Sequence, residues 1–164
     1  MVEFLRHCES FYNVICRDDI ICQDSVDFLD CGLSPDGIKQ AGNLKGVYDL
    51  VIVSPLRRCI NTLEYSQIRY NKLVIEPLVR EYRTNYCDFL ENEDIILETE
   101  DEIFNRLTEF KTKLKKLITK YKKILVVTHA DFIWYLTSKN PLSEDMERFG
   151  VWLENGEIYN FITD

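Results

Sequence analysis

Histidine is scarce in this chain of 164 residues, which contains only two. The sequence also has no H-E-x-x-H motif, no paired Cys/His spacing and no C-x-x-C pair. Zinc sites and dithiol redox centres are normally recognised by such spacings. These absences argue against a metal centre, and they raise the question of what the two histidines do.

Long apolar runs are also missing, and no stretch approaches the roughly 20 residues that a membrane helix needs. Six cysteines are present. Because no secretory signal pattern accompanies them, we expect reduced thiols in a cytoplasmic protein. No low-complexity tract, linker or internal repeat occurs, so residues 1–164 are expected to form a single domain.

Positive charge is in deficit: 20 Lys and Arg residues stand against 28 Asp and Glu residues, a net charge of -8. Seven of the lysines are concentrated in residues 111–123, a run without acids. An acidic segment precedes this run, and acids at the start and lysines at the end of a helix suit the helix dipole. We therefore expect a solvated helix face, and neither a nucleic-acid nor a membrane partner.

Short apolar runs do occur, bounded by turn signals and separated by segments with helical periodicity. This alternation is typical of an α/β fold. We predict a three-layer αβα sandwich with a mostly parallel sheet and an antiparallel C-terminal edge hairpin around Asn155-Gly156. The expected parallel strands are Val2–Leu5, Leu50–Val53, Leu73–Ile75 and Ile124–Thr128.

Capping signals locate the helices between these strands. Ser34, followed by Pro35, is expected to begin one helix. A second helix is expected over about residues 55–67. Thr99 and Glu102 have capping-box spacing and should begin the longest helix. Its apolar stripe is assigned to the core and comprises Ile103, Leu107, Phe110, Leu114, Leu117 and Tyr121.

Polar residues gather where three of the predicted strands end. Arg6-His7 follows the first strand, Ser54 to Arg58 the second, and Thr128-His129 the fourth. In parallel α/β sheets, ligands bind outside the carboxyl ends of the strands. Arginine binds phosphate oxygens in a fork, and a neutral imidazole can act as a nucleophile near pH 7. The pattern therefore favours phosphoryl chemistry at this edge.

The segment RHCESFYN, residues 6 to 13, resembles the R-H-G-E-[ST]-x-x-N signature of the histidine phosphatase (phosphoglycerate-mutase-like) superfamily, with Cys8 in place of the glycine. LSPDGIKQA is similar to that family's L-T-x-x-G-x-x-Q-A segment. SPLRRCINT is similar to S-x-L-x-R-A-x-x-T, which aligns Arg58 rather than Arg57 with the second phosphate arginine. EPLVREY resembles the L-x-x-E stretch, and VVTHADF the strand that ends in the second histidine. The likeness spans residues 2 to about 136 in the family's order.

The resemblance implies a role for each matched residue. His7 would attack phosphorus, and Glu81 would protonate the leaving oxygen and then activate water. No metal or organic cofactor is needed in this scheme. Asp88 and Glu91 lie close to Glu81 in the sequence and are alternatives for the acid. The phosphoryl oxygens would be bound by Arg6, Asn13, Arg58 and His129.

Cys8 is the main departure from the family pattern. If its position needs a positive φ, a Cβ there costs roughly 1–2 kcal/mol. Ala130 and Asp131 also replace small residues after the second histidine. We expect the site to survive with altered substrate access. A second hypothesis is that Arg6 acidifies the adjacent Cys8 thiol and makes the activity redox-sensitive.

The leading function is hydrolysis of phosphate monoesters, either a small metabolite or a phosphoprotein. Glu81 and His129 are close in sequence, which leaves little room for a lid and favours an open site and hydrolysis. Phosphoglycerate mutase-type phosphoryl transfer is the alternative enzyme, and a degenerate phosphate- or protein-binding module is the non-enzymatic one. A cysteine phosphatase is excluded, because no cysteine precedes an arginine by six positions. The oligomeric state stays open.

Overall fold

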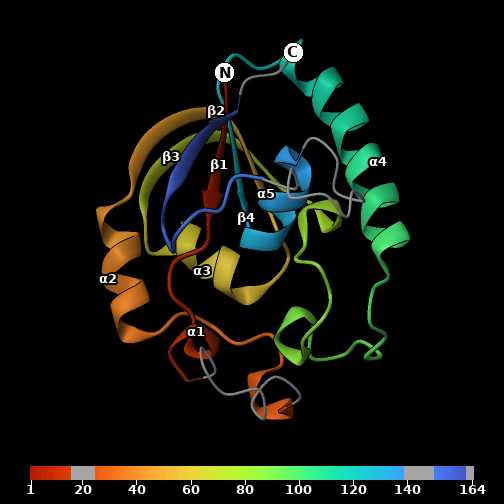
Figure 1. Ribbon diagram of the computed structural model, residues 1–164. Coiled ribbons are helices and arrows are strands. Elements are labelled where there is room, and N and C mark those ends of the chain that lie inside the picture. The colour runs from red at the N-terminus through yellow and green to blue at the C-terminus, as the bar shows by residue number, and fades with distance from the viewer. Residues whose placement is uncertain (16–24, 139–149, 162–164) are drawn as a thin grey trace.

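The computed structural model describes residues 1–15, 25–138 and 150–161. Figure 1 shows a central sheet with helices on both sides. The strands are β1 (Val2–Arg6), β2 (Lys45–Val53), β3 (Gln67–Ile75), β4 (Ile124–Thr128) and β5 (Ile158–Phe161). The helices are α1 (Phe11–Ile15), α2 (Pro35–Asn43), α3 (Arg57–Glu64), α4 (Glu100–Ile118) and α5 (Ala130–Thr137), with short 3-10 helices η2 (Val26–Phe28), η3 (Pro77–Val79) and η4 (Tyr86–Asp88).

The sheet confirms the predicted α/β class. Its strand order is β3-β2-β4-β1-β5, in which β1, β2, β3 and β4 are parallel and β5 runs antiparallel to β1. All four predicted parallel strands are present. β2 and β3 begin earlier than expected, because their first halves carry exposed polar residues and show no buried apolar run. The carboxyl ends of β1, β2 and β4 therefore meet at one edge.

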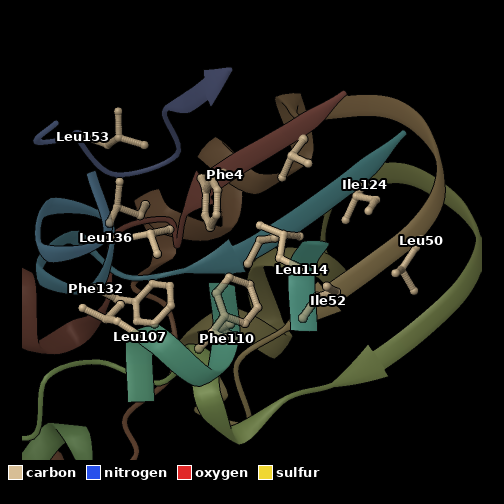
Figure 2. Close-up of a cluster of buried hydrophobic side chains, with 14 of the residues drawn as sticks. Phe4, Leu50, Ile52, Leu107, Phe110, Leu114, Ile124, Phe132, Leu136 and Leu153 are labelled. Atoms are coloured by element: carbon tan, nitrogen blue, oxygen red, sulfur yellow. The ribbon is translucent and has the colours of Figure 1, made fainter. Parts of the chain in front are cut away.

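Two apolar layers hold the helices on the sheet. On one face, the aromatic and aliphatic side chains of α4 and α5 pack against Phe4, Ile52 and Val126, and Figure 2 shows this cluster. On the other face, Cys59 and Leu63 of α3 pack against residues of β2 and β4. The arrangement is the expected three-layer sandwich, and its hydrophobic burial is the main favourable term for folding.

The helix starts follow their capping signals. The Ser34 side chain accepts a hydrogen bond from the Gly37 amide, which begins α2 as predicted. Thr99 and Glu102 form the expected reciprocal capping box at the start of α4. The α3 helix lies within the predicted range. Within the three described segments, no helix combines the length and hydrophobicity required to span a bilayer.

The C-terminal edge differs in one respect from the predicted hairpin. The turn at Gly156 is present, with a φ of 77°, and β5 forms the antiparallel edge with β1. Residues 151–154 form no strand. Their backbone groups bond elsewhere: the Val151 amide donates to Thr137 Oγ1, and the Leu153 carbonyl accepts from Arg6. β5 therefore pairs with the free edge of β1 and not with a strand formed by residues 151–154.

Candidate active site

The register of the sheet brings the two histidines together. β1 and β4 are paired so that Arg6 lies opposite Thr128, and the first residue after each strand is a histidine. The His7 and His129 rings are edge to face, with centroids 5.2 Å apart. Both side chains are buried. Pairing of parallel strands therefore confirms that both histidines lie at one sheet edge.

The hydrogen bonds of His7 determine its tautomer. Nδ1 lies 2.7 Å from the carbonyl oxygen of Cys8, to which it donates. Nε2 lies 3.2 Å from Nε of Arg58, which can only donate. Nε2 is therefore the unprotonated nitrogen. Burial, reinforced by the charges of Arg58 and Arg6, lowers the pKa of His7 well below 6.5. The imidazole is neutral at pH 7, the state that a nucleophile requires.

Arg58 is held by three bonds in the buried site. Besides Nε, its Nη1 donates to the Cys87 carbonyl at 2.6 Å and its Nη2 to Asp88 Oδ1 at 2.9 Å. Both side chains of the Arg58–Asp88 pair are almost fully buried. A guanidinium has five N–H donors, so two remain for a ligand. Arg57, in contrast, faces solvent and pairs with Glu91.

Arg6 approaches the same site from the end of β1. Its Nη1 donates to the Leu153 carbonyl at 2.6 Å, and its guanidinium lies 5.5 Å from the centre of the Trp152 ring. Its Nε is buried and has no hydrogen-bond partner. A buried donor without a partner is costly, and a bound anion would satisfy it.

Glu81 is anchored through one of its two oxygens. Oε1 accepts from the backbone amides of Tyr82 and Phe132, both at 3.0 Å. Burial, together with the charges of Asp131 and Asp88, raises the pKa of Glu81 to about 8. The carboxyl is therefore protonated at neutral pH. Because Oε1 accepts two bonds, the proton resides on Oε2, as a general acid requires.

The loop that carries Glu81 is fixed by Arg106, a residue that sequence reasoning missed. From α4, Arg106 donates to the carbonyls of Leu78, Arg80 and Glu81 at 2.9, 2.7 and 3.1 Å. It also forms two bonds to the carboxylate of Glu98. A lone arginine in a helix gives no sequence signal for this role, because the partners are backbone oxygens.

Asn13 and His129 occupy different positions relative to the site. The Oδ1 atom of Asn13 accepts from the Ser10 hydroxyl at 2.9 Å and from Asn155 Nδ2 at 3.2 Å. His129 is fully buried, and its Nε2 lies 2.8 Å from the Ser54 hydroxyl. Asn13 is thus tied to the loop after β1, and His129 packs behind His7.

These groups surround a cavity of about 130 Å³. Of the six predicted site residues, five line it, and His129 does not. Asp88 and Glu91, the two alternatives to Glu81 as the acid, both form ion pairs. Asp88 pairs with Arg58 in the site, whereas Glu91 pairs with the exposed Arg57. The residues in the lining are Arg6, His7, Ser10, Tyr12, Asn13, Arg58, Glu81, Asn85, Cys87, Asp88, Ala130, Asp131 and Trp152.

The motif residues outside the cavity support the loop after β1. The Glu9 amide donates to Gln40 Oε1 at 3.0 Å, and the Ser34 hydroxyl donates to a Glu9 oxygen at 2.7 Å. A Cβ on Gly37 would lie 1.9 Å from the Glu9 carbonyl oxygen, so only glycine permits this approach. Thr62 accepts from the Cys8 amide. The similarity of these segments to the family motifs therefore has a local structural reason.

Two expectations for Cys8 are not upheld. Asp30 is the only non-glycine residue with positive φ among the described residues, so no such strain arises at Cys8. The thiol is fully buried. Burial raises its pKa to about 11, against the opposing effect of a hydrogen bond with Thr62. The hypothesis that Cys8 is acidified is therefore wrong, because desolvation raises the pKa of the thiol. The redox sensitivity of the activity stays a prediction.

The chain is similar to known proteins in structure. No family model and no curated protein sequence matches the chain. Among solved structures, alpha-ribazole phosphatase from Shigella flexneri matches with a TM-score of 0.66 at 18% identity, covering 96% of this chain and 87% of that one. The ecdysone phosphate phosphatase of Bombix mori, in complex with tungstate, gives 0.66 at 16% identity, covering 96% and 86%.

A third match is phosphoglycerate mutase from Thermus thermophilus, with a TM-score of 0.59 at 16% identity, covering 96% of this chain and 90% of that one. The three proteins have the fold that the sequence motifs predict. This chain therefore has the histidine phosphatase (phosphoglycerate-mutase-like) fold.

Proposed function

We propose that the protein is a phosphatase that hydrolyses phosphate monoesters through a phosphohistidine on His7. One observation carries this proposal: the unprotonated Nε2 of His7, bonded to Arg58, and the protonated carboxyl of Glu81 line the same cavity. A neutral nucleophile and a protonated acid are the two groups that ester cleavage requires.

In the first step, His7 Nε2 forms a bond to phosphorus while the bond from phosphorus to the ester oxygen breaks. Glu81 gives its proton to that leaving oxygen. In the second step, the Glu81 carboxylate takes a proton from water, and the water oxygen attacks phosphorus as the bond to Nε2 breaks. Inorganic phosphate leaves and Glu81 is again protonated. Neither step as written uses a metal or an organic cofactor.

Three side chains are suited to hold the phosphoryl oxygens. Arg6 brings an unpartnered Nε, and Arg58 has two donors left. Fixed donors of this kind stabilise charge that grows in the transition state. Asn13 lines the same cavity. His129 would reach the phosphoryl group only by exchanging its bond to Ser54.

The size of the cavity bears on the substrate. About 130 Å³ is smaller than the 300–1,000 Å³ of typical ligand sites, so it accommodates a phosphoryl group and few further atoms. The rest of the substrate would lie outside, which is compatible with a small ester or a phosphorylated side chain. The cytoplasmic location stays a prediction from the sequence.

The test is hydrolysis of para-nitrophenyl phosphate, with and without a chelator, by the parent protein and by His7→Ala. We expect chelator-resistant turnover that His7→Ala abolishes, and an acid-labile phosphoenzyme in the parent. Lys39→Ala, on the exposed face of α2, is the control and should behave as the parent does. Phosphate binding without turnover in the parent would instead support the degenerate binding module.

A further inference from the structure

Asp131 has a carboxylate that the proposed mechanism does not use. It is the second residue of α5, two positions after His129, and it lines the cavity with Arg6, Arg58 and Glu81. In the part of the chain that the structure describes, the Asp131 carboxylate has no hydrogen-bond or ion-pair partner. Burial and the charge of Asp88 raise its pKa, against the opposing charges of Arg6 and Arg58. A partly buried carboxylate without a direct hydrogen-bond or ion-pair partner is costly, and a bound cation would offset that cost.

The charges that line the cavity cancel before a substrate enters. Arg58 is neutralised by its ion pair with Asp88, and Glu81 holds a proton at neutral pH. Arg6 and Asp131 then carry opposite charges. A dianionic phosphate would therefore bring two uncompensated negative charges into this cavity. An ester whose alcohol part carries a positive charge would reduce that excess and would place its cation where Asp131 attracts it.

The surroundings of Asp131 also favour a cation. The rings of Tyr12 and Trp152 line the same cavity, and aromatic faces attract cations, as the Arg6 guanidinium 5.5 Å from the Trp152 ring centre illustrates. The Trp152 side chain is 53% exposed and can contact the part of a substrate that lies outside. A role at the N-terminus of α5 alone would account for an acid there, but not for its place in a cavity that Arg6, Arg58 and His7 also line.

We infer that the substrate is a phosphate monoester with an ammonium group in its alcohol part, and that the Asp131 carboxylate binds this group while Arg6 and Arg58 bind the phosphate. This inference rests on the proposed function and specifies its substrate class. The ammonium group takes no part in bond breaking. Asp131 is a specificity-determining residue in this assignment, since it discriminates between esters that differ in charge.

The test compares aminoethyl phosphate with n-propyl phosphate, which have the same number of heavy atoms and differ in the ammonium group. Their binding is measured by calorimetry and by competition against para-nitrophenyl phosphate, in the parent and in Asp131→Asn. We expect the parent to bind aminoethyl phosphate about tenfold more tightly, the order expected of one charge-assisted contact in a partly solvated cavity. Asp131→Asn should lose this preference and bind n-propyl phosphate more tightly than the parent does.

Asp36→Asn is the matched control. Asp36 is likewise the second residue of a helix, α2, but it is exposed and pairs with Lys39. Its substitution should leave the preference intact. Equal binding of the two esters by the parent, or an undiminished preference in Asp131→Asn, would overturn the inference. Calorimetry distinguishes the failure of one proposal from the failure of the other. Absence of para-nitrophenyl phosphate hydrolysis would contradict the proposed phosphatase activity, whereas the binding preference tests the role of Asp131 alone.

Discussion

Arg106, which is partly buried, and Arg58, which is almost fully buried, both pair with carboxylates but differ in how many N–H donors they keep free. Arg106 uses all five of its N–H donors within the protein, on Glu98 and on three backbone carbonyls. Arg58 uses three, one of them on the imidazole of His7. The difference separates a structural arginine from one that can still bind a ligand. Burial and ion pairing alone do not distinguish them, whereas the count of free donors does.

The largest effect is expected from Arg58→Lys. Lysine keeps the charge but cannot bind His7, Cys87 and Asp88 together with a phosphoryl oxygen, because it lacks the guanidinium fork. We expect kcat/KM for para-nitrophenyl phosphate to fall by about 10³-fold, or ~4 kcal/mol. Arg57→Lys is the neighbouring control and should retain activity within a factor of about two, since its pair with Glu91 is exposed. Similar losses in both variants would contradict the assignment of Arg58.

Arg106→Ala is expected to act on stability instead. It leaves three carbonyls without their donor and leaves the buried Glu98 carboxylate with the Arg83 amide but no guanidinium fork, so the free energy of unfolding should fall by ~3 kcal/mol. Urea denaturation measures this. Arg83→Ala is the control, because Arg83 is partly exposed and lies 3.9 Å from the same carboxylate. An unchanged urea midpoint in Arg106→Ala would contradict the structural role assigned to Arg106.

The loop that presents His7 can be disturbed without touching either arginine. A Cβ at Gly37 would collide with the Glu9 carbonyl oxygen at 1.9 Å, so Gly37→Ala should lower the free energy of unfolding by ~2 kcal/mol through forced displacement of α2. Gly42→Ala in the same helix meets no atom within 4 Å and should stabilise by about 0.5–1 kcal/mol. Thermal unfolding of the two variants gives opposite signs if this contact is as tight as described.

The smallest expected effect is on the pH dependence of kcat/KM. With a pKa of about 8, Glu81 loses its proton as pH rises, and kcat/KM should fall about tenfold per pH unit above that value. Asp131→Asn removes one of the negative charges that raise this pKa, so the decline should begin at lower pH. A decline at the same pH in both proteins would show that another group titrates.

Glu81 also makes the stability of the folded protein depend on pH. Its pKa is raised from 4.5, so between these two values the folded state holds a proton that the unfolded state does not. The free energy of unfolding therefore decreases as pH rises through this window. Glu81→Gln should remove that part of the slope, which pH-dependent denaturation can measure.

Much of the architecture follows from the sequence by itself. The apolar runs, the cap at Ser34, the capping box at Thr99 and the two histidines at strand ends are local or periodic signals, and each is present in the structure. The parallel α/β class then places His7 and His129 at one edge, because parallel strands end on the same side. The Asn155-Gly156 turn was also predictable, but not the partner of the strand that follows it.

Only the tertiary structure decided how the site is held and charged. Arg106 and Asp88 act through contacts with backbone or side chains distant in sequence, and Asp131 lines the cavity that they help to form; no local pattern marks these three residues. The raised pKa of the Cys8 thiol likewise depends on burial. The sequence determined which residues reach the sheet edge, since that depends on periodicity. Desolvation and long-range hydrogen bonds decided their protonation and their free donors, and these exist only when the chain is folded.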